Sequence, residues 1–182
     1  MNTFLLSTER LTLRPVAATD LEAVHHILSE PLVDRYNTLG VPASLDDTRA
    51  HLDYMVSGNQ ATPCERYSFA IIGEQYMGLI AINLGVPKYR RAEVWYKLLP
   101  DHWGEGYATE ALRAIVDLGF DTLGLHRIEA GCAVENIGSI RVLEKVGMQR
   151  EGRKRKSLPL ETGWEDGYEY GMLVEDRARF PS

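Results

Sequence analysis

The segment 98–120 constrains the fold most, because it reads as the end of a strand, a glycine-rich turn and an amphipathic helix. Its apolar residues recur at the spacing of one helical face, and they are Ala108, Ala111, Leu112, Ile115, Val116 and Gly119. Gly104 and Gly106 in the turn lack a side chain that would keep another molecule from the backbone. The first amide groups of a helix point out of its positive end, so this junction predicts a phosphate or pyrophosphate site.

Three interpretations of this junction remain open. The first is a plain strand–helix connection whose small residues serve only packing. The second is a dinucleotide-binding G-x-G-x-x-G motif, but Thr109 replaces the third glycine and the motif lies far from the start of the chain. The third is a cradle for the pyrophosphate of another nucleotide cofactor.

Two motifs resemble one known family. Residues 103–111 read W-G-E-G-Y-A-T-E-A, which resembles the acyl-CoA-binding signature of the GNAT acetyltransferases in its RimJ/RimL variant. Gly106 and Ala108 match the general pattern, and Trp103 stands where arginine or glutamine is usual. Residues 136–148 read N-I-G-S-I-R-V-L-E-K-V-G-M and resemble the second RimJ/RimL signature, with methionine in place of the final phenylalanine.

The two ends of the chain also fit this resemblance. Residues 9–15 read E-R-L-T-L-R-P, and Asp166 and Tyr170 match a closing D-x-x-x-Y pattern. The resemblance implies an acetyl-CoA-dependent N-acetyltransferase that uses no metal and acts on an amine acceptor. It also implies that two central strands part, so that the pantetheine arm of the cofactor enters between them. A homodimer is an expectation of the family alone.

Length and composition favour one soluble domain over residues 1–182. Hydrophobic residues make up 45% and charged residues 25%, and no apolar run is long enough to span a membrane. The chain has two cysteines and no evident signal peptide, so we expect a cytoplasmic protein. The net charge of −6 argues against DNA or RNA as a partner. An anionic cofactor must therefore be held by local donors.

The order of expected elements indicates an α+β fold, with one mixed and mostly antiparallel twisted sheet flanked by helices. Strands are expected at 11–15, 67–72, 76–84, 92–99, 128–134, 150–156 and 169–173. Helices are expected at 21–28, 44–55, 107–120 and 136–145. A capping box of Thr19 and Glu22 should start the first helix, and Gly147 should end the last. Residues 158–167 read as a loop.

The resemblance assigns cofactor binding to three groups of residues. The main chain of Leu98 and Leu99 would pair with pantetheine, although both side chains also suit core packing. The turn would hold the pyrophosphate through Trp103, Gly104, Glu105, Gly106, Tyr107, Ala108 and Thr109. The second motif would contribute Asn136, Ser139 and Lys145. Because Glu105 and Glu110 have the wrong charge for an anion site, we expect Glu105 to face solvent and Glu110 to complement the helix dipole.

Direct acetyl transfer requires a neutral amine. At pH 7 about a seventh of an α-amine is neutral, but only about one lysine in 2500, so a base is most needed for lysine. Glu93 matches the glutamate of an A-E-x-x-Y pattern, and we assign it as base through a water molecule. A structural role for Glu93 stays open, as do Glu65, Glu74 and the Asp166 region as alternatives.

A proton donor would assist departure of the CoA thiolate. Leu143 occupies the position of the tyrosine that many GNAT enzymes use, so the resemblance favours Ser139 instead. Ser139 also has a structural alternative, since it could merely support the turn, whereas Asn136 suits both a helix cap and a pantetheine contact. Neither Cys64 nor Cys132 has an evident activating setting, which disfavours a covalent acetyl-cysteine.

Two further groups of residues have functional and structural interpretations. The basic run 150–156 is either a solvated surface or a contact for the 3′-phosphate of the cofactor or for an acidic acceptor. Aromatic residues that suit either the acceptor side or the core are Tyr36, Trp95, Trp164 and Tyr168. The expected function is direct acetyl transfer in a ternary complex to a protein N-terminus, of the ribosomal-protein type, or to a small amine or peptide. The rivals are a non-catalytic acyl-CoA sensor and an RNA-associated protein.

Overall fold

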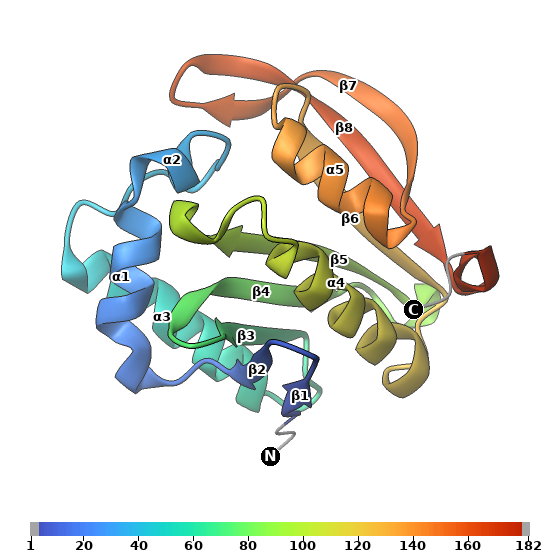
Figure 1. The fold of residues 1–182 in the computed structure, drawn as a ribbon, viewed down its shortest axis with the longest axis horizontal. Helices are drawn as coiled ribbons and strands as arrows, with labels where there is room; N and C mark the ends of the chain where they lie inside the picture. The colour runs from blue at the N-terminus through green and yellow to red at the C-terminus, as the bar shows by residue number, and fades with distance from the viewer. Residues whose placement is uncertain (1–3, 180–182) are drawn as a thin grey trace.

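A computed structural model describes residues 4–179 of the protein. All of its strands belong to one open mixed sheet with the order β1-β2-β3-β4-β5-β6-β8-β7 (Figure 1). The strands are β1 Leu6–Ser7, β2 Thr12–Pro15, β3 Arg66–Ile72, β4 Tyr76–Leu84, β5 Arg91–Leu98, β6 Arg127–Ala133, β7 Gln149–Leu160 and β8 Gly163–Leu173. Within the described range β5 and β6 form the one parallel pair, and the other neighbours are antiparallel.

Helices cover both faces of the sheet (Figure 1). They are α1 Leu21–Ser29, α2 Pro31–Asp34, α3 Leu45–Gln60, α4 Tyr107–Asp117, continued by a π-helical turn Leu118–Thr122, and α5 Ile137–Val146. The side chains of α1 and α3 share one buried cluster with β3 and β4. Those of α4 and α5 share the other, larger cluster. The α+β architecture expected from the sequence is confirmed.

Local sequence signals explain how several helices begin and end. The Ser44 hydroxyl accepts a hydrogen bond from the Asp47 amide at the start of α3. At the start of α5 the Ser139 amide donates to the Asn136 side chain over 3.1 Å. Gly147 ends α5 with a φ of 100°, a left-handed conformation that favours glycine. The predicted boundaries of α5 are thus confirmed.

The predicted capping box at Thr19 is wrong. Residues Ala18–Asp20 form a 3-10 turn, and α1 begins only at Leu21. The buried carboxylate of Asp20 accepts a hydrogen bond from the Ala17 amide and forms an ion pair with the partly exposed Arg14 at 2.6 Å. The pairing of Asp20 with Arg14 of β2 fixes this turn, and the apolar pattern of the helix does not indicate it.

Two other elements extend further than the sequence indicates. The helix expected to end at Met55 continues to Gln60, and Gly58 lies inside it. Glycine serves packing at this position, because a Cβ would lie 2.3 Å from the Arg66 side chain. Strands β7 and β8 occupy most of the expected loop 158–167, and only Glu161 and Thr162 separate them. A bulge between Lys154 and Leu158 breaks the strand's alternation and so disguises it in the sequence.

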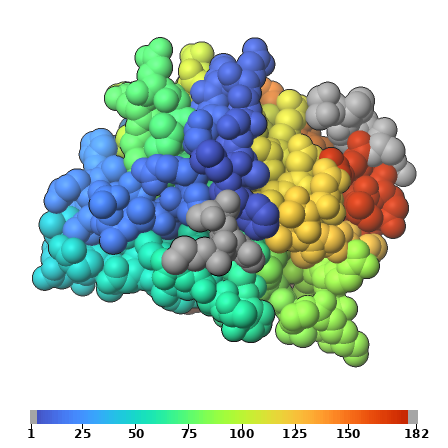
Figure 2. All heavy atoms as spheres, turned by 90° about the horizontal axis from the view of Figure 1, so that it is seen from below, coloured from blue at the N-terminus to red at the C-terminus, as the bar shows by residue number. Residues whose placement is uncertain are grey.

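The N-terminal segment packs against the region of α4. Figure 2 shows its dark-blue atoms against yellow residues of the α4 region, and a hydrogen bond from Thr8 to Glu110 joins the two segments. The short strand β2 continues this segment at the edge of β3. Among residues 4–179 no helix has the length and apolar character needed to cross a membrane.

A glycine on β4 permits the close approach of β5. A Cβ at Gly78 would lie 2.2 Å from the main-chain oxygen of Lys97, so any side chain must displace β5. We predict that Gly78→Ala lowers the free energy of unfolding by about 1–3 kcal/mol, the usual cost of overpacking.

Chemical denaturation would measure this, with Gly131→Ala as control because the nearest atom to its added Cβ is 3.8 Å away. Equal stability of the two variants would contradict the packing argument.

Candidate active site

Strands β5 and β6 part in the middle of the sheet. Their parallel pairing covers three positions and ends at Glu93 opposite Glu129. β5 nevertheless continues to Leu98, and β6 continues to Ala133 while remaining paired with β8. A cavity of about 1040 Å³ lies here, lined on β5 by Val94, Tyr96 and Leu98 and on β6 by Ala130, Cys132 and Ala133.

The main chain of β5 is available along this gap. The main-chain groups of Arg91 and Leu99 form hydrogen bonds on the side of β5 that faces β4. The Arg91 carbonyl accepts from the Gly85 amide, and the Leu99 amide donates to the Met77 carbonyl. Main-chain groups alternate sides along a strand, so those of Tyr96 and Leu98 face the gap. The Leu98 carbonyl accepts a hydrogen bond from the Trp103 indole at 2.7 Å.

The structure corrects the expectation for Leu99. Its amide donates to the Met77 carbonyl at 2.9 Å, and its carbonyl accepts from the His102 amide at 3.0 Å. Both main-chain groups are therefore occupied inside the protein. Leu99 also lies outside the lining of the cavity, so we omit it from the candidate site.

The glycine-rich turn presents a row of unused amides. Gly104 and Gly106 have φ values of 83° and 84°, the left-handed conformation in which glycine is favoured. Within residues 4–179 the amides from Gly104 to Thr109 have no hydrogen-bond acceptor, and no side chain caps α4. These donors, at the positive end of an eleven-residue helix, suit a pyrophosphate.

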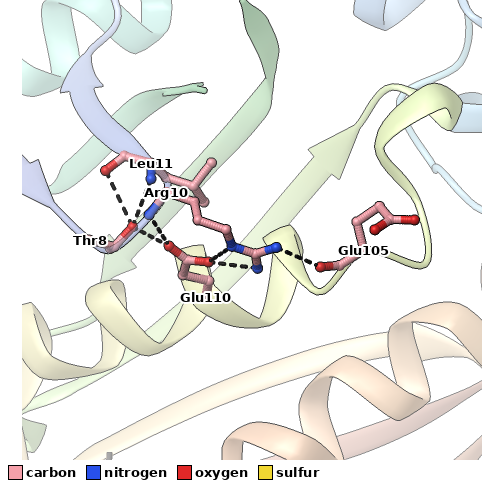
Figure 3. A network of polar contacts seen from close by, with 5 residues as sticks. All are labelled: Thr8, Arg10, Leu11, Glu105 and Glu110. Carbon is pink, nitrogen blue, oxygen red and sulfur yellow. Dashed lines mark hydrogen bonds and ion pairs between the residues drawn. The ribbon is translucent and has the colours of Figure 1, made fainter. Parts of the chain in front are cut away.

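Arg10, in the N-terminal segment, holds this turn in place (Figure 3). Its Nε donates to Glu110 at 2.7 Å, its Nη1 donates to the Glu105 carbonyl at 3.0 Å, and its guanidinium lies over the Tyr107 ring. The Thr8 hydroxyl and the Arg10 amide also donate to Glu110. Arg10 was not predicted from the sequence, because its partner Glu110 lies 100 positions away.

The two acidic residues beside the turn do not obstruct an anion site. Figure 3 shows the Glu105 side chain directed away from Arg10, and this side chain is exposed and outside the cavity lining. Partial burial raises the pKa of Glu110, but hydrogen bonds from Thr8 and Arg10 outweigh this effect and lower it. Glu110 is therefore ionised, and its hydrogen bonds with Thr8 and Arg10 stabilise the turn.

Residues of both sequence motifs meet in the cavity. Those predicted to bind the cofactor line it, except for Leu99 and Glu105, and they are Leu98, Trp103, Gly104, Gly106, Tyr107, Ala108, Thr109, Asn136, Ser139 and Lys145. Arg141 and Lys145 on α5 are exposed at its edge, and neither side chain has an ion pair within the described residues. They supply local positive charge in a protein with a net charge of −6.

Ser139 has a partner that the sequence analysis missed. Its hydroxyl shares a hydrogen bond of 2.8 Å with the hydroxyl of Tyr96. Burial raises the pKa of Tyr96 above its usual value, and the hydrogen bond with Ser139 offsets this only in part. Tyr96 is the tyrosine of the A-E-x-x-Y pattern, and this pattern is the sequence signal that could have identified it. Leu143 is buried in the core.

Cys132 lines the gap in a setting that opposes a thiolate. Burial raises the pKa of its thiol to about 11 despite a hydrogen bond from Ser139. At pH 7 about one such thiol in ten thousand is then ionised. Cys132 therefore suits the packing role that the sequence indicated.

Glu93 is an exposed carboxylate at the mouth of the same cavity. It stands on β5 opposite Asn83 and Glu129, where the pairing with β6 ends. Alternation places Glu93 and Tyr96 on opposite faces of β5. Ser139 and Glu93 therefore reach the cavity from different sides of that strand.

The remaining sequence candidates separate into two groups. Tyr36 and Trp95 line the cavity, whereas Trp164 and Tyr168 do not. Asp166 bonds to Arg153 and to the Lys156 amide outside the cavity, which removes it from the candidate bases. Much of the basic run is paired on the surface, through Arg153–Asp166, Lys154–Glu169 and Lys156–Glu165.

Comparisons with known proteins agree with this geometry. Residues 10–149 match the family model described as an acetyltransferase (GNAT) domain. The chain belongs to the GNAT family. It is 34% identical to the uncharacterized N-acetyltransferase YnaD of Bacillus subtilis, over 94% of this chain and 98% of that protein. The enzyme class, N-acetyltransferase, is thereby established.

Two further comparisons add a cofactor and an acceptor. The solved structure of Mycobacterium smegmatis RimJ in complex with CoA-disulfide has a TM-score of 0.82 and 25% identity, covering 99% of this chain and 89% of that one. The spermidine N(1)-acetyltransferase of Vibrio cholerae is 25% identical over 79% of this chain and 81% of that protein. GNAT relatives of this chain thus include a CoA-binding protein and an enzyme named for a small polyamine.

The cradle can be tested at Gly106. Gly106 has a φ of 84°, which is unfavourable for any residue with a Cβ, so a substitution strains the turn that carries the row of amides. We predict that Gly106→Ala weakens CoA binding at least about tenfold, which calorimetry would measure.

Gly163→Ala is the matched control, because Gly163 also has a positive φ (114°) but lies in the β7–β8 turn with open space around it. Unchanged affinity in Gly106→Ala, or an equal loss in both variants, would count against the cradle.

Proposed function

We propose that this GNAT protein moves an acetyl group from acetyl-CoA directly to a primary amine within a ternary complex. The observation that supports it most is that one cavity joins the unused amides at Gly106 to the carboxylate of Glu93 and the hydroxyl of Ser139. When bound, acetyl-CoA supplies an acetyl group activated as a thioester. The protein's residues then bind, orient and exchange protons with the reactants.

The fit of the chain to acetyl-CoA rests on three features of the site. The amides of 104–109 would hold the pyrophosphate, and Arg141 and Lys145 would add positive charge at the cavity edge. The Leu98 amide would donate to a carbonyl of the pantetheine arm, since the Leu98 carbonyl already accepts from Trp103. The Asn136 side chain caps α5 through its oxygen, so its NH₂ group is left to donate to the same arm.

Glu93 is proposed as the base that removes a proton from the acceptor amine. Its exposed position fits a proton path through water rather than a direct contact. The need for this base depends on the acceptor, since an α-amine is partly neutral at pH 7 and a lysine is not.

The Tyr96–Ser139 pair is proposed to protonate the departing thiolate. Ser139 faces the gap from the start of α5, and Tyr96 can pass it a proton through their shared hydrogen bond. Because burial raises the pKa of Tyr96, its hydroxyl stays protonated and holds Ser139 as a hydrogen-bond donor to the thiolate. The proton that the thiol finally carries replaces the one that the acceptor amine loses. Cys132 has no part in this scheme.

The acceptor is proposed to be a protein N-terminus, of the ribosomal-protein type, or a small amine or peptide. The resemblance to the RimJ/RimL branch supports the former, and the similarity to a spermidine acetyltransferase supports the latter. Release of free thiol from acetyl-CoA with a panel of amines tests the function. Tight CoA binding without thiol release from any amine would instead indicate a sensor.

Glu93→Gln should distinguish the two kinds of amine. We predict a loss of turnover of about 10²–10⁴-fold for a lysine-like acceptor, the usual contribution of a general base, and a smaller loss for an α-amine. Steady-state kinetics at pH 7 would measure both.

Glu74→Gln is the control, because Glu74 is exposed in the β3–β4 turn and does not line the cavity. An equal loss for both acceptors, or no loss, would remove Glu93 as the base.

Cys132→Ala and Ser139→Ala should differ in the same assay. The first should keep turnover within about twofold, because a thiol with a pKa of about 11 is a poor nucleophile at pH 7. The second should lower kcat by about tenfold or more if Ser139 conveys the proton.

Mass spectrometry of the enzyme during turnover provides a second readout. An acetyl group on Cys132 would contradict direct transfer.

A further inference from the structure

One buried cation in the cavity wall has no role in the scheme above. Lys97 lies on β5, and its Nζ atom is buried without a hydrogen-bond partner in the described residues. An ammonium group carries three donors and is costly to bury unpaired. The structure therefore contains positive charge that an additional group could satisfy.

The surroundings of Lys97 are mostly apolar. The register of the sheet places it opposite Leu79, which belongs to the buried cluster that α1 and α3 form with the sheet. Leu28, Leu32 and Val33 line the same cavity from α1 and α2. Burial lowers the pKa of Lys97 to about 8, and the field of Asp34 opposes this in part. Asp34 has no ion pair with Lys97, and it accepts a hydrogen bond from Asn37 instead.

Other groups on this side of the cavity also lack partners. Within residues 4–179 the Nε of Arg66 and the hydroxyl of Ser68 are buried without hydrogen bonds, and both residues line the cavity. The carboxylates among the lining residues are Glu93 and Glu135, and Glu135 belongs to the turn before α5. The wall beneath α1 and α3 is therefore rich in unsatisfied donors, although the whole protein is acidic.

We propose that Lys97 is the anion-binding residue of the acceptor site, and that the acceptor is an amine carrying a carboxylate within its first residue. The amine and the carboxylate of the acceptor must lie close together, because Lys97 directly precedes Leu98, whose main chain faces the gap. The ammonium is a point charge on a flexible four-carbon stem, so it can turn from the cavity wall toward a bound carboxylate. This assignment rests on the proposed acetyl transfer.

A carboxylate suits these groups better than a phosphate. Tight phosphate sites use several convergent charged donors or a row of amides. Here Lys97 is one ammonium, and the guanidinium of Arg66 is already stacked on the Tyr54 ring at 3.5 Å. A single carboxylate can accept from Lys97 and leave the amine free to reach the thioester.

Two pairs of short peptides test this inference. They differ only in the first residue, aspartate against asparagine and glutamate against glutamine, so the reacting α-amine is kept the same. The wild-type protein should favour the acidic member by about 10- to 100-fold in kcat/KM, mainly through KM, as for one charge-assisted hydrogen bond.

Variants of Lys97 assign that preference to the residue. Lys97→Met should abolish it by raising KM for the acidic peptide alone, and Lys97→Arg should retain part of it. Lys88→Met is the control, because Lys88 is exposed in the β4–β5 loop and outside the cavity. It should keep the full preference.

A second readout separates this inference from the proposed function. Calorimetry with the CoA-saturated protein compares binding of the same peptides without turnover. A preference in binding with no thiol release would support the role of Lys97 and overturn the transferase proposal. Equal use and equal binding of both peptides, or acetylation of Lys97 itself without an acceptor, would overturn the inference.

Discussion

The structure depends on the short pairing between β5 and β6. A longer ladder would pair the main-chain hydrogen-bonding groups of both strands and leave no gap between them, as the ladder between β6 and β8 does. Because the ladder ends at Glu93, the main chain of Leu98 and the side chains of Tyr96 and Cys132 border a cavity. Each proposed function of the site follows from this gap in the sheet.

The gap alone would not orient a ligand, and the turn before α4 provides the orientation. Its glycines expose a row of amides, and the N-terminal segment fixes that row through Arg10 and Glu110 (Figure 3). Two segments that are 100 positions apart in the sequence thus meet at the candidate site. A site built in this way keeps its donors rigid and leaves them free of internal acceptors, which favours binding of an anion.

The sequence predicts those parts of the site that are local. The glycine turn and the Asn136 cap each lie within a few residues, so their pattern is readable, and the family resemblance added Ser139 and Glu93 as candidates. Contacts between distant segments were missed, including Arg10 with Glu110 and Tyr96 with Ser139. The family resemblance also placed Leu99 beside Leu98 as a pantetheine contact, but alternation along the strand directs its main chain to β4 and that of Leu98 to the gap.

The central claim is that main-chain groups at the gap and in the turn bind the CoA chain. Amide hydrogen exchange, followed residue by residue with and without CoA, tests it most directly. The account predicts new protection at Leu98 and across 104–109, with no change at Leu99, whose amide is already bonded to Met77. Unchanged exchange at Leu98 and in the turn on saturation with CoA would contradict it.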